Sequence, residues 1–511
     1  MLRSYKLLAI RYWLLAIVGQ APWPAADALV GLGRQSSEPG QGARRGRGRP
    51  PHWGLLAISC WLLAFGFAAF GQNADWIYSA RYVVTMDAQH RLIENGAVAV
   101  RGDRIVAVGS RAEIERQFPA RQRLDRPNAI IMPGLINTHT HAAMSLLRGI
   151  ADDMKLQDWL EKFIFPAEAK NVTPDFVLWG TRLACLEMML SGTTAFVDMY
   201  YFEDRVAQAT KEAGMRGVLG ETVLRFKSPD SPTPADAMQL TEKFLQQYKG
   251  DPLVVAAPAP HAIYTNDDGT LRQTRKLADK YQVPLVIHLS ETKRENDDAM
   301  KDRGMSPTRL LDMLGVLDGP VIAAHGVWLS DDDIRILKAH GSGVAHCPSS
   351  NMKLASGVAP VMKLLAAGVP TGLGTDGPAG SNNDFDLMEE MNLAANLQKV
   401  STNDPTALNA EQAITMATIG GARVATLDRE IGSLETGKRA DLITVRIDRP
   451  HAVPMYNVYS QIVYALKGSD VQDVVVNGRQ IVRDGQSLTL DSKAILAKAA
   501  EYADKITRSL K

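Results

Sequence analysis

The sequence predicts an α/β protein: a (β/α)8 TIM barrel with a small β-sandwich domain formed by the segments that flank the barrel. Three observations lead to this prediction. Between about 134 and 430, short apolar runs alternate with stretches able to form helices. On both sides of that region, β-rich pieces are separated by glycines. Residues suited to chemistry stand at the ends of the apolar runs, where a TIM barrel places its active site.

The composition is that of a soluble globular protein. Of the 511 residues, 46% are hydrophobic and 22% charged, which excludes a largely disordered chain and a polytopic membrane protein. The formal net charge of +1 argues against non-specific nucleic-acid binding, so we expect no nucleic-acid partner. The three cysteines, Cys60, Cys185 and Cys347, form no CxxC pair, and neither a disulfide scaffold nor a cysteine zinc site is expected. A bound metal must therefore be held by His, Asp or Glu.

The first 74 residues differ from the rest and are predicted to be a flexible basic segment. They hold eight basic and two acidic residues, and an uncharged, mostly apolar stretch at 54–71 follows the Arg-rich run 44–49. This layout is typical of a secretory signal peptide, and a short membrane anchor is the alternative. A third reading is that the first 50 or so residues are not translated. We therefore expect export or membrane attachment if 54–71 acts as a signal or anchor, and a cytoplasmic protein otherwise.

The flanks of the barrel read as β-structure. In 75–133, the pieces 82–84, 97–100 and 105–108 are separated by Gly96, Gly102 and Gly109. In 431–490, the strand 441–445 is followed by 471–482, where Asn477-Gly478 predicts a hairpin turn. Two all-β pieces at opposite ends of a chain can pair into one domain. We therefore expect a composite β-sandwich from 75–133 and 431–490, a catalytic barrel inserted at 134–430, and a C-terminal helix at 491–511.

Eight apolar runs are the expected barrel strands, and a possible helix follows each of them. They are 130–137, 193–198, 217–222, 253–257, 285–288, 321–325, 343–346 and 371–375.

Histidines and one aspartate gather at the ends of these runs. The first run leads into His139-Thr140-His141, and alternate strand residues point the same way, so both imidazoles can face the barrel mouth. The ends of later runs carry His261, His288, His325, His346 and Asp376. Because six of the ten histidines of the chain lie at strand ends, the pattern predicts a metal site rather than scattered structural histidines.

His139, His141, His288 and Asp376 make a complete ligand set for one divalent metal ion. Imidazole and carboxylate ligands suit Zn²⁺, which keeps an open position for water, and Fe²⁺ is the alternative. Zinc-bound water loses a proton near pH 7. A second metal would need a bridging group, but the stretch 254–261 contains no lysine that could supply one. We therefore expect a single metal.

Three residues are the candidates for catalysis. Glu291 lies just beyond His288 and is not a ligand, and the zinc deaminases of nucleobases use such a glutamate to move protons. A surface salt bridge is the ordinary alternative for Glu291. His325 can polarise the attacked group or hold the hydroxide, and Asp376 can both ligate the metal and accept the proton of water.

Five segments carry a resemblance to a known family. They are 132–141 (MPGLINTHTH), 288–292 (HLSET), 324–326 (AHG), 350–354 (SNMKL) and 374–377 (GTDG). The first resembles the first-strand signature of the amidohydrolase superfamily, and the others resemble its deaminase and chlorohydrolase branch. Over 76–490 the sequence is most similar to the methylthioadenosine/S-adenosylhomocysteine deaminases.

The resemblance implies roles for particular residues. It assigns the metal to His139, His141, His288 and Asp376, and it assigns substrate binding to Glu168, His261, Glu291 and Asp376. An arginine near the end of the third strand contacts substrate in some members, and Arg225 is the candidate here. Glu168 would accept hydrogen bonds from the ribose hydroxyls, since one carboxylate can accept two at once; otherwise it is a helix-capping or solvated residue. We also expect a homo-oligomer.

The resulting hypothesis is hydrolytic deamination of the adenine ring. The substrates would be 5'-methylthioadenosine, S-adenosylhomocysteine or a similar adenosine: hydroxide attacks C6, Glu291 delivers a proton, and the inosine analogue and ammonia form. An alternative is a deaminase or chlorohydrolase of another aromatic heterocycle, such as guanine, cytosine, a pterin or a triazine. A third hypothesis, from another class, is a non-catalytic binding or assembly barrel.

Overall fold

The computed structural model describes residues 73–510. The apolar stretch 54–71, and with it nearly all of the predicted basic segment, lies outside the described residues. Among residues 73–510, no helix is both long enough and apolar enough to cross a bilayer.

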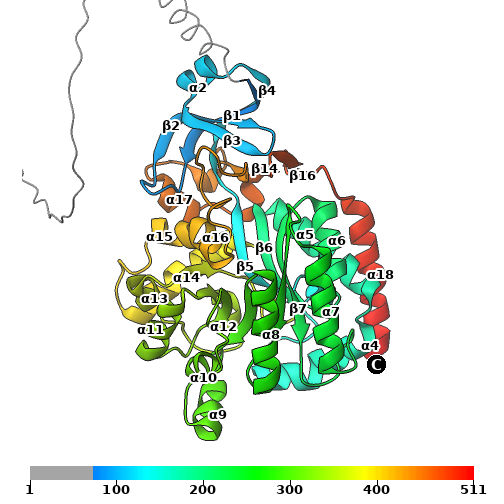
Figure 1. Cartoon of the computed structure of the whole chain (residues 1–511). Helices are drawn as coiled ribbons and strands as arrows, with labels where there is room; N and C mark the ends of the chain where they lie inside the picture. Colours follow the sequence, from blue (N-terminus) through cyan, green and yellow to red (C-terminus); the bar gives the residue numbers. More distant parts are fainter. Residues whose placement is uncertain (1–72, 511) are drawn as a thin grey trace, which may run out of the picture. The chain divides into compact units, whose positions relative to one another are not determined.

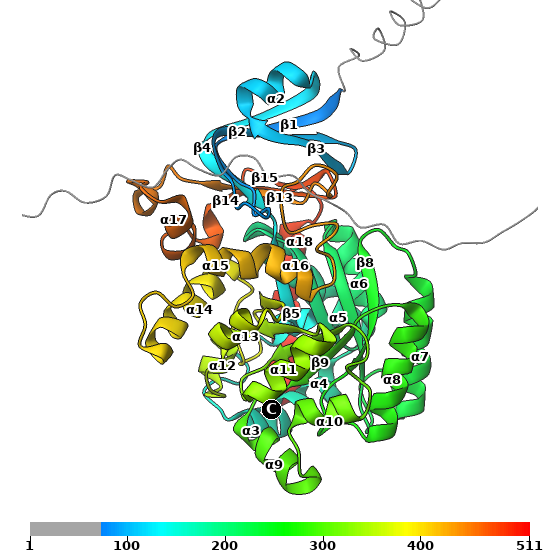
Figure 2. The same ribbon diagram turned by 60° about the vertical axis from the view of Figure 1, so that its left-hand side comes forward.

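Eight parallel strands form the barrel sheet (Figures 1 and 2), with the order β8-β7-β6-β5-β12-β11-β10-β9. The two outer strands of this order meet at the mouth, where the His288 amide donates to the His261 carbonyl over 2.9 Å. The predicted (β/α)8 fold is thus confirmed. The strands are β5 (Leu135–Thr140), β6 (Thr193–Tyr200), β7 (Arg216–Val223), β8 (Val254–Pro260), β9 (Leu285–Leu289), β10 (Val321–His325), β11 (Gly343–His346) and β12 (Thr371–Leu373).

Helices follow the strands and cover the outside of the sheet, as Figure 1 shows. They are α3 (Leu156–Trp159), η2 (Leu160–Ile164), α4 (Phe165–Asn171), α5 (Pro174–Leu190), α6 (Glu203–Ala213), α7 (Pro234–Gln247), α8 (Asp268–Tyr281), α9 (Lys293–Arg303), α10 (Pro307–Met313), α11 (Asp331–His340), α12 (Pro348–Lys353), α13 (Val361–Ala367) and α14 (Leu387–Thr402). Several begin at a Ser or Thr cap followed by proline, as at Thr173, Thr233 and Ser306, where the hydroxyl satisfies a free helix N–H.

The barrel strands are buried on both faces. Every residue of β6 and β7 is buried, which is expected for parallel strands covered by helices. Ile136, Val218 and Ile322 belong to one buried cluster inside the barrel. This packing fixes the strand backbones, so the residues at the strand ends are held in defined positions at the mouth.

The segments on both sides of the barrel combine in a second sheet of eight strands, with the order β16-β15-β14-β13-β4-β1-β2-β3. One flank supplies β1 (Ala74–Val84), β2 (Leu92–Arg101), β3 (Arg104–Ser110) and β4 (Ala120–Pro133); the other supplies β13 (Leu442–Arg446), β14 (Val471–Val476), β15 (Arg479–Arg483) and β16 (Gln486–Ser487). Asn477 and Gly478 form the predicted hairpin turn, with φ of 52° and 75°. The exact domain boundaries stay a prediction.

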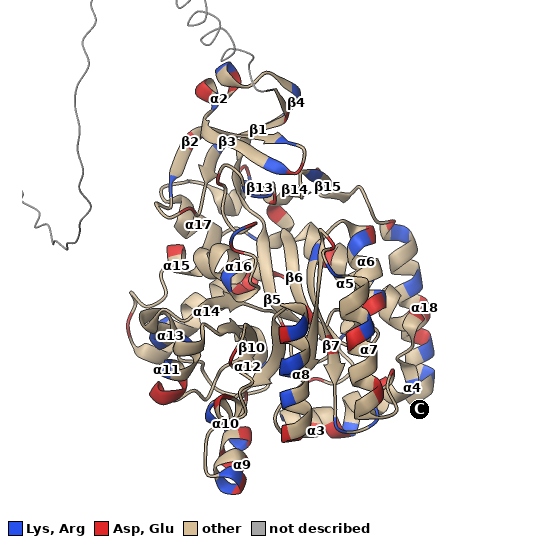
Figure 3. Cartoon of the chain, in the orientation of Figure 1, with Lys and Arg blue, Asp and Glu red and all other residues tan. Residues whose placement is uncertain are grey.

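The remaining elements are short connections and the last helix. They are α2 (Arg111–Gln117), η1 (Ala142–Leu147), α15 (Ala410–Thr415), η3 (Met416–Gly420), α16 (Gly421–Val424), η4 (Pro450–Ala452), α17 (Val458–Tyr464), η5 (Gly468–Asp470) and α18 (Ser492–Leu510). Figure 3 shows basic and acidic residues mixed along the outer helices, for example on α7, α8 and α18, rather than gathered by sign.

One predicted strand is wrong in its bounds. The run 130–137 is divided between two sheets, because β4 ends at Pro133, where it pairs with β13, and the barrel strand β5 begins at Leu135. Gly134 stands between them, and a Cβ there would lie 2.2 Å from the Thr194 side chain. A continuous apolar run therefore hides a crossing from one sheet to the other, and periodicity alone does not reveal it.

Candidate metal centre

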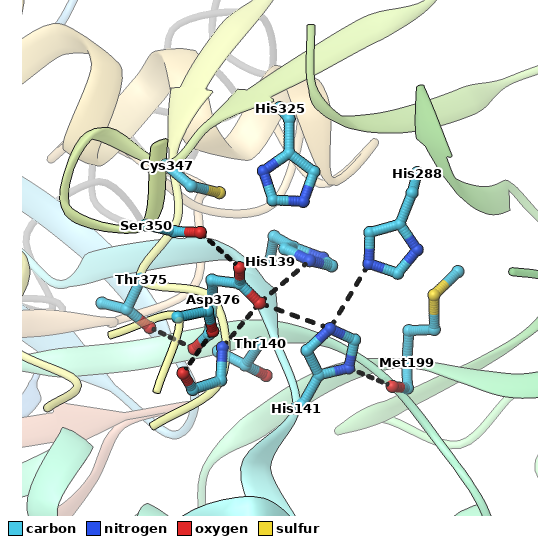
Figure 4. A network of polar contacts seen from close by, with 12 residues as sticks. His139, Thr140, His141, Met199, His288, His325, Cys347, Ser350, Thr375 and Asp376 are labelled. Atoms are coloured by element: carbon cyan, nitrogen blue, oxygen red, sulfur yellow. Dashed lines mark hydrogen bonds and ion pairs between the residues drawn. The ribbon is translucent and has the colours of Figure 1, made fainter. Parts of the chain in front are cut away.

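The predicted ligands converge at the barrel mouth, as Figure 4 shows. His139 lies on β5 and His141 directly after its last residue, and their Nε2 atoms lie 3.6 Å and 3.3 Å from Oδ1 of Asp376. Nε2 of His288, from β9, lies 3.3 Å from Nε2 of His141. His139, His288 and His325 form a second group of close donor atoms, so His139 stands at the centre of the cluster.

The hydrogen bonds of the imidazoles leave their Nε2 atoms free for a cation. Nδ1 of His141 donates to the Met199 carbonyl over 2.6 Å, and Nδ1 of His288 donates to the His261 carbonyl over 2.9 Å. Such bonds fix the tautomer and orient a metal-binding imidazole. Neither ring nitrogen of the buried His139 has a hydrogen-bond partner among the described residues. Because unpaired buried polar atoms are costly, this donor set fits a divalent metal ion.

The protonation states also suit metal binding. Burial, followed by the neighbouring histidines, lowers the pKa of His288 well below its ordinary value. Burial acts to raise the pKa of Asp376, but His139 and the other nearby histidines outweigh it and lower that pKa to about 2. At neutral pH the imidazole is therefore neutral and the carboxylate is charged, which are the forms that bind metals.

Left-handed backbone turns aim these side chains into the mouth. Ser290, His325 and Asp376 follow or end three different strands, and their φ values are 50°, 73° and 63°. Non-glycine residues adopt this region rarely, at a cost of about 1–3 kcal/mol, and often at functional sites. No residue type in the sequence signals these turns.

Two adjacent residues of α12, which the site prediction did not include, orient the cluster. The Ser350 hydroxyl donates to Oδ2 of Asp376 over 2.7 Å. Nδ1 of His325 lies 3.2 Å from Oδ1 of Asn351 and donates to it. Both residues belong to the segment 350–354, which carries part of the family resemblance. Their place in this segment is the sequence feature that could have identified them as site residues.

Glu291 lies beside the cluster but outside the ligand groups. Its Oε2 is 3.9 Å from Nε2 of His325, and its amide donates to Oε2 of Glu295 over 2.8 Å, which fixes the backbone. Burial, and then the negative charge of Asp376, raises the pKa of Glu291 to about 8. A buried carboxyl that holds a proton at neutral pH is suited to general acid catalysis.

A pocket opens above the cluster and encloses about 580 Å³ of space, including solvent at its mouth. Its lining combines the candidate residues with apolar and aromatic side chains: His141, Met144, Leu156, Trp159, Leu160, Ile164, Phe165, Glu168, Met199, Tyr200, Tyr201, Thr222, His261, Tyr264, His288, Glu291, His325, Asp376 and Ser381. Tyr200, Tyr201, Tyr264 and Trp159 were not predicted, because no local sequence pattern shows which aromatic side chains line a pocket.

Glu168 and His261 line this pocket as the prediction requires. Glu168 lies on α4, is buried, and accepts a hydrogen bond from the Tyr200 hydroxyl over 2.7 Å. Burial raises its pKa to about 7, against the lowering effect of Tyr200. Burial and nearby histidines lower the pKa of His261 to about 3, so its ring is neutral at physiological pH.

The structure does not bring Arg225 to this pocket. Arg225 is exposed and lines a neighbouring cavity, which also contacts Leu156 and Tyr264, two residues of the first pocket. Its role toward substrate therefore stays a prediction, and any contact would have to be with a part of the substrate that reaches beyond Tyr264.

A barrel with a cluster of histidines and an aspartate at its mouth, and with a buried glutamate beside them, is the architecture of a metal-dependent hydrolase. The chain belongs to the amidohydrolase family, whose model matches residues 130–481. Residues 96–120 also match a bacterial imidazolonepropionase-like composite domain, within the β-rich flank.

Individual relatives are similar over nearly their whole length. A 5-methylthioadenosine/S-adenosylhomocysteine deaminase 1 from Syntrophus aciditrophicus is 46% identical, over 86% of this chain and 99% of its own. A 5'-deoxyadenosine deaminase from Methanosarcina barkeri is 42% identical, over 85% and 98%. The crystal structure of an adenosine deaminase from Xanthomonas campestris with bound zinc is 38% identical, with a TM-score of 0.84, and the match covers 85% of this chain and 99% of that one.

Proposed function

We propose that this protein removes the 6-amino group of adenosine derivatives by hydrolysis, with 5'-methylthioadenosine and S-adenosylhomocysteine as the substrates. The observation that carries the proposal is the cluster of histidines and Asp376 at the barrel mouth, in a pocket that also contains the buried carboxyls of Glu291 and Glu168. The relatives act on adenosines with different groups at the 5' position, which supports an adenosine substrate.

The proposed metal ligands are His139, His141, His288 and Asp376, and the proposed ion is one Zn²⁺. When bound, zinc lowers the pKa of its water to about 7 and so supplies hydroxide at neutral pH. Asp376, which is ionised, lies where it can accept the proton of the attacking water. The Ser350 hydroxyl holds Asp376 in this orientation.

Glu291 carries the proton transfers to the substrate. It is neutral at pH 7, so it can protonate the purine ring during attack at C6. The two protons of the attacking water, one of them taken up first by Asp376, then convert the amino group to ammonia and reprotonate Glu291, which leaves Asp376 ionised again. His325 is neutral, is held by Asn351, and faces Glu291, where it can polarise the reacting centre. His261 presents a neutral ring that can bond to the purine. Ammonia and the inosine analogue result.

Glu168 is proposed to bind the ribose, and its protonation makes this testable by pH. Because the pKa of Glu168 is about 7, it is largely protonated at pH 6 and ionised at pH 8. Only the carboxylate accepts hydrogen bonds with both oxygens, so KM for a nucleoside is expected to fall roughly tenfold over that range. Glu168→Gln should raise KM by roughly 10- to 100-fold and remove this pH dependence. Steady-state kinetics at pH 6, 7 and 8 measure both effects, and a Gln variant that retains the wild-type KM and slope would refute the ribose role.

A substrate panel tests the proposed function. The zinc-loaded protein is incubated with 5'-methylthioadenosine, S-adenosylhomocysteine, 5'-deoxyadenosine, guanine, cytosine, a pterin and a triazine, and released ammonia or chloride is measured. Turnover restricted to the adenosines supports the proposal. Turnover of only another heterocycle supports the alternative named from the sequence, and no turnover of any compound favours a non-catalytic barrel.

Assembly and location stay predictions. A homo-oligomer is proposed, and light scattering of the purified full chain tests it. Membrane attachment or export depends on 54–71, which lies outside the described residues. N-terminal sequencing of the natively expressed protein tests whether this stretch is retained.

A further inference from the structure

Three buried carboxyl groups lie behind the metal site, and the proposed reaction uses none of them. Asp198 lies near the end of β6, Glu203 is the first residue of α6, and Glu221 is near the end of β7. Their exposed fractions are 0%, 0% and 1%. Within residues 73–510, no Lys, Arg or His forms an ion pair with any of them. Burying three ionised carboxylates without a positive partner would be very costly in free energy, so we infer that some of these groups are protonated.

Each of these carboxyls has one oxygen that is bonded and one that is not. One oxygen of Asp198 accepts from the Thr140 hydroxyl, that of Glu203 from the Tyr200 amide, and that of Glu221 from the Glu203 amide, over 2.6, 2.9 and 3.0 Å. The second oxygen of each has no ordinary donor among the described residues. Neighbouring carboxyls in this state can bond to each other only if protons lie between them.

The groups around these carboxyls indicate where their protons lie. The titratable groups that face Glu203 are Asp198 from β6 and Glu221 from β7, and Asp230 lies beyond Glu221. All of them are acidic. Burial, followed by the negative charges of Asp198 and Glu221, raises the pKa of Glu203 well above its ordinary value, and the Asp198 carboxyl lies within reach of a proton held by Glu203. Burial, followed by the negative charge of Asp230, likewise raises the pKa of Glu221 well above its ordinary value, and the Asp230 carboxyl lies within reach of a proton held by Glu221.

At the Asp198 end, this row of carboxyl groups contacts the segment that carries two of the proposed metal ligands, His139 and His141. Pairing between β5 and β6 is irregular between Asn137 and Thr140 and resumes where Thr140 pairs with Asp198. Side-chain hydrogen bonds reinforce this pairing, because Oδ1 of Asp198 accepts from the Thr140 hydroxyl and from the Ala142 amide, over 2.6 and 2.7 Å. These two donors stand on either side of His141. A displaced Asp198 would therefore release His141.

We propose that Glu203 and Glu221 are neutral acids that donate their protons along a buried chain to Asp198 and Asp230, and that this chain holds the 139–141 segment in position to bind its metal. Glu203 is thus a positioning residue. At the outer end, Asp230 accepts from the Phe202 amide and the Ser228 hydroxyl, over 2.9 and 2.6 Å, so the chain also fastens the start of α6.

Glu203→Gln is the decisive variant, because glutamine reproduces the acid form. Its carbonyl can accept from the Tyr200 amide, and its NH₂ can donate to Asp198. The full-length variant is expected to bind zinc within about threefold of wild type, measured by competition with a chelator. Glu203→Met keeps the size but removes the donor, and is expected to weaken zinc binding by about 10-fold or more. Thr140→Val removes the donor at the other end and should weaken binding in the same way.

The pH dependence of protein stability distinguishes a neutral from an ionised Glu203. An acid whose pKa is higher in the folded than in the unfolded protein stabilises the fold while it is protonated. This contribution is complete below the pKa of the unfolded state and is lost as the pH rises toward the pKa of the folded state. Wild type should therefore lose stability relative to Glu203→Gln between pH 6 and pH 9, by roughly 3 °C in the unfolding midpoint of the zinc-loaded protein. Glu212→Gln is the control on the same helix: Glu212 pairs with Arg182 and its pKa is lowered, so its difference from wild type should stay constant over this range.

Several outcomes would overturn the inference. The first is a Glu203→Gln protein that does not fold or that binds zinc more than about 10-fold more weakly than wild type. The second is a difference in unfolding midpoint between wild type and Glu203→Gln that stays constant from pH 6 to pH 9. The third is unchanged zinc binding in both Glu203→Met and Thr140→Val. None of these measurements uses deamination, so a failed substrate panel would leave the inference standing, and its own failure would leave the panel result intact.

Discussion

Asp376→Asn is expected to lower kcat/KM for 5'-methylthioadenosine by at least about 10³-fold, since removing one member of a catalytic group commonly costs this much or more. Asp376 supplies the only carboxylate of the proposed ligand set, and its Oδ1 faces Nε2 of both His139 and His141. Asparagine removes the charge but tolerates the left-handed backbone, where φ is 63°. The loss therefore reports on the charge rather than on misfolding.

The metal content of the variant should fall together with its activity. Metal analysis of the purified protein measures this, and an unchanged unfolding midpoint in the metal-free state checks the fold. Asp297→Asn on α9 is a suitable control, because it removes only an exposed ion pair with Lys293 and should leave activity unchanged. An Asp376→Asn protein with full zinc and near-normal turnover would show that Asp376 is neither a ligand nor a base.

Glu291→Gln is expected to keep its zinc and to lose at least about 10²-fold in kcat, because positioned acid–base groups contribute about this much or more. The glutamate is not in the proposed ligand set, and its backbone is fixed by Glu295 rather than by its own side chain. Glutamine keeps the shape and can still donate a hydrogen bond, but it cannot transfer a proton. KM should therefore change much less than kcat.

The same variant has a defined pH signature. In wild type the acid form of Glu291, with a pKa of about 8, is lost as pH rises, so kcat should fall on the alkaline side. The Gln variant should show no such limb in its residual activity. Retention of both the rate and the alkaline limb after substitution would remove Glu291 from the mechanism and assign the limb to another group.

The barrel and the meeting of four proposed ligands at its mouth could be predicted because the strand ends of a barrel lie side by side. His139, His141, His288 and Asp376 are far apart in sequence, but each follows an apolar run, and the closed sheet brings them to one edge. Glu291 was predictable for the same reason, since it lies one turn beyond a strand end.

Other parts of the site depend on tertiary contacts that no local pattern encodes. Glu203 begins a helix and reads as an ordinary exposed first-turn acid, which favours the helix dipole, yet it is fully buried against Asp198. Tyr200 reads as a strand residue and donates to Glu168 from another element. The division of the run 130–137 at Gly134 depends on pairing with β13, from the far end of the chain.

We propose that deamination requires one metal ion, which four residues hold at the barrel mouth. A titration tests it most directly: the chelator-treated full chain is supplied with zinc in steps while the loss of adenine absorbance of 5'-methylthioadenosine is followed. We expect no turnover without metal and a linear rise that reaches its plateau at one zinc per chain. Full turnover by the metal-free protein, or a plateau only at two zinc ions per chain, would contradict this account.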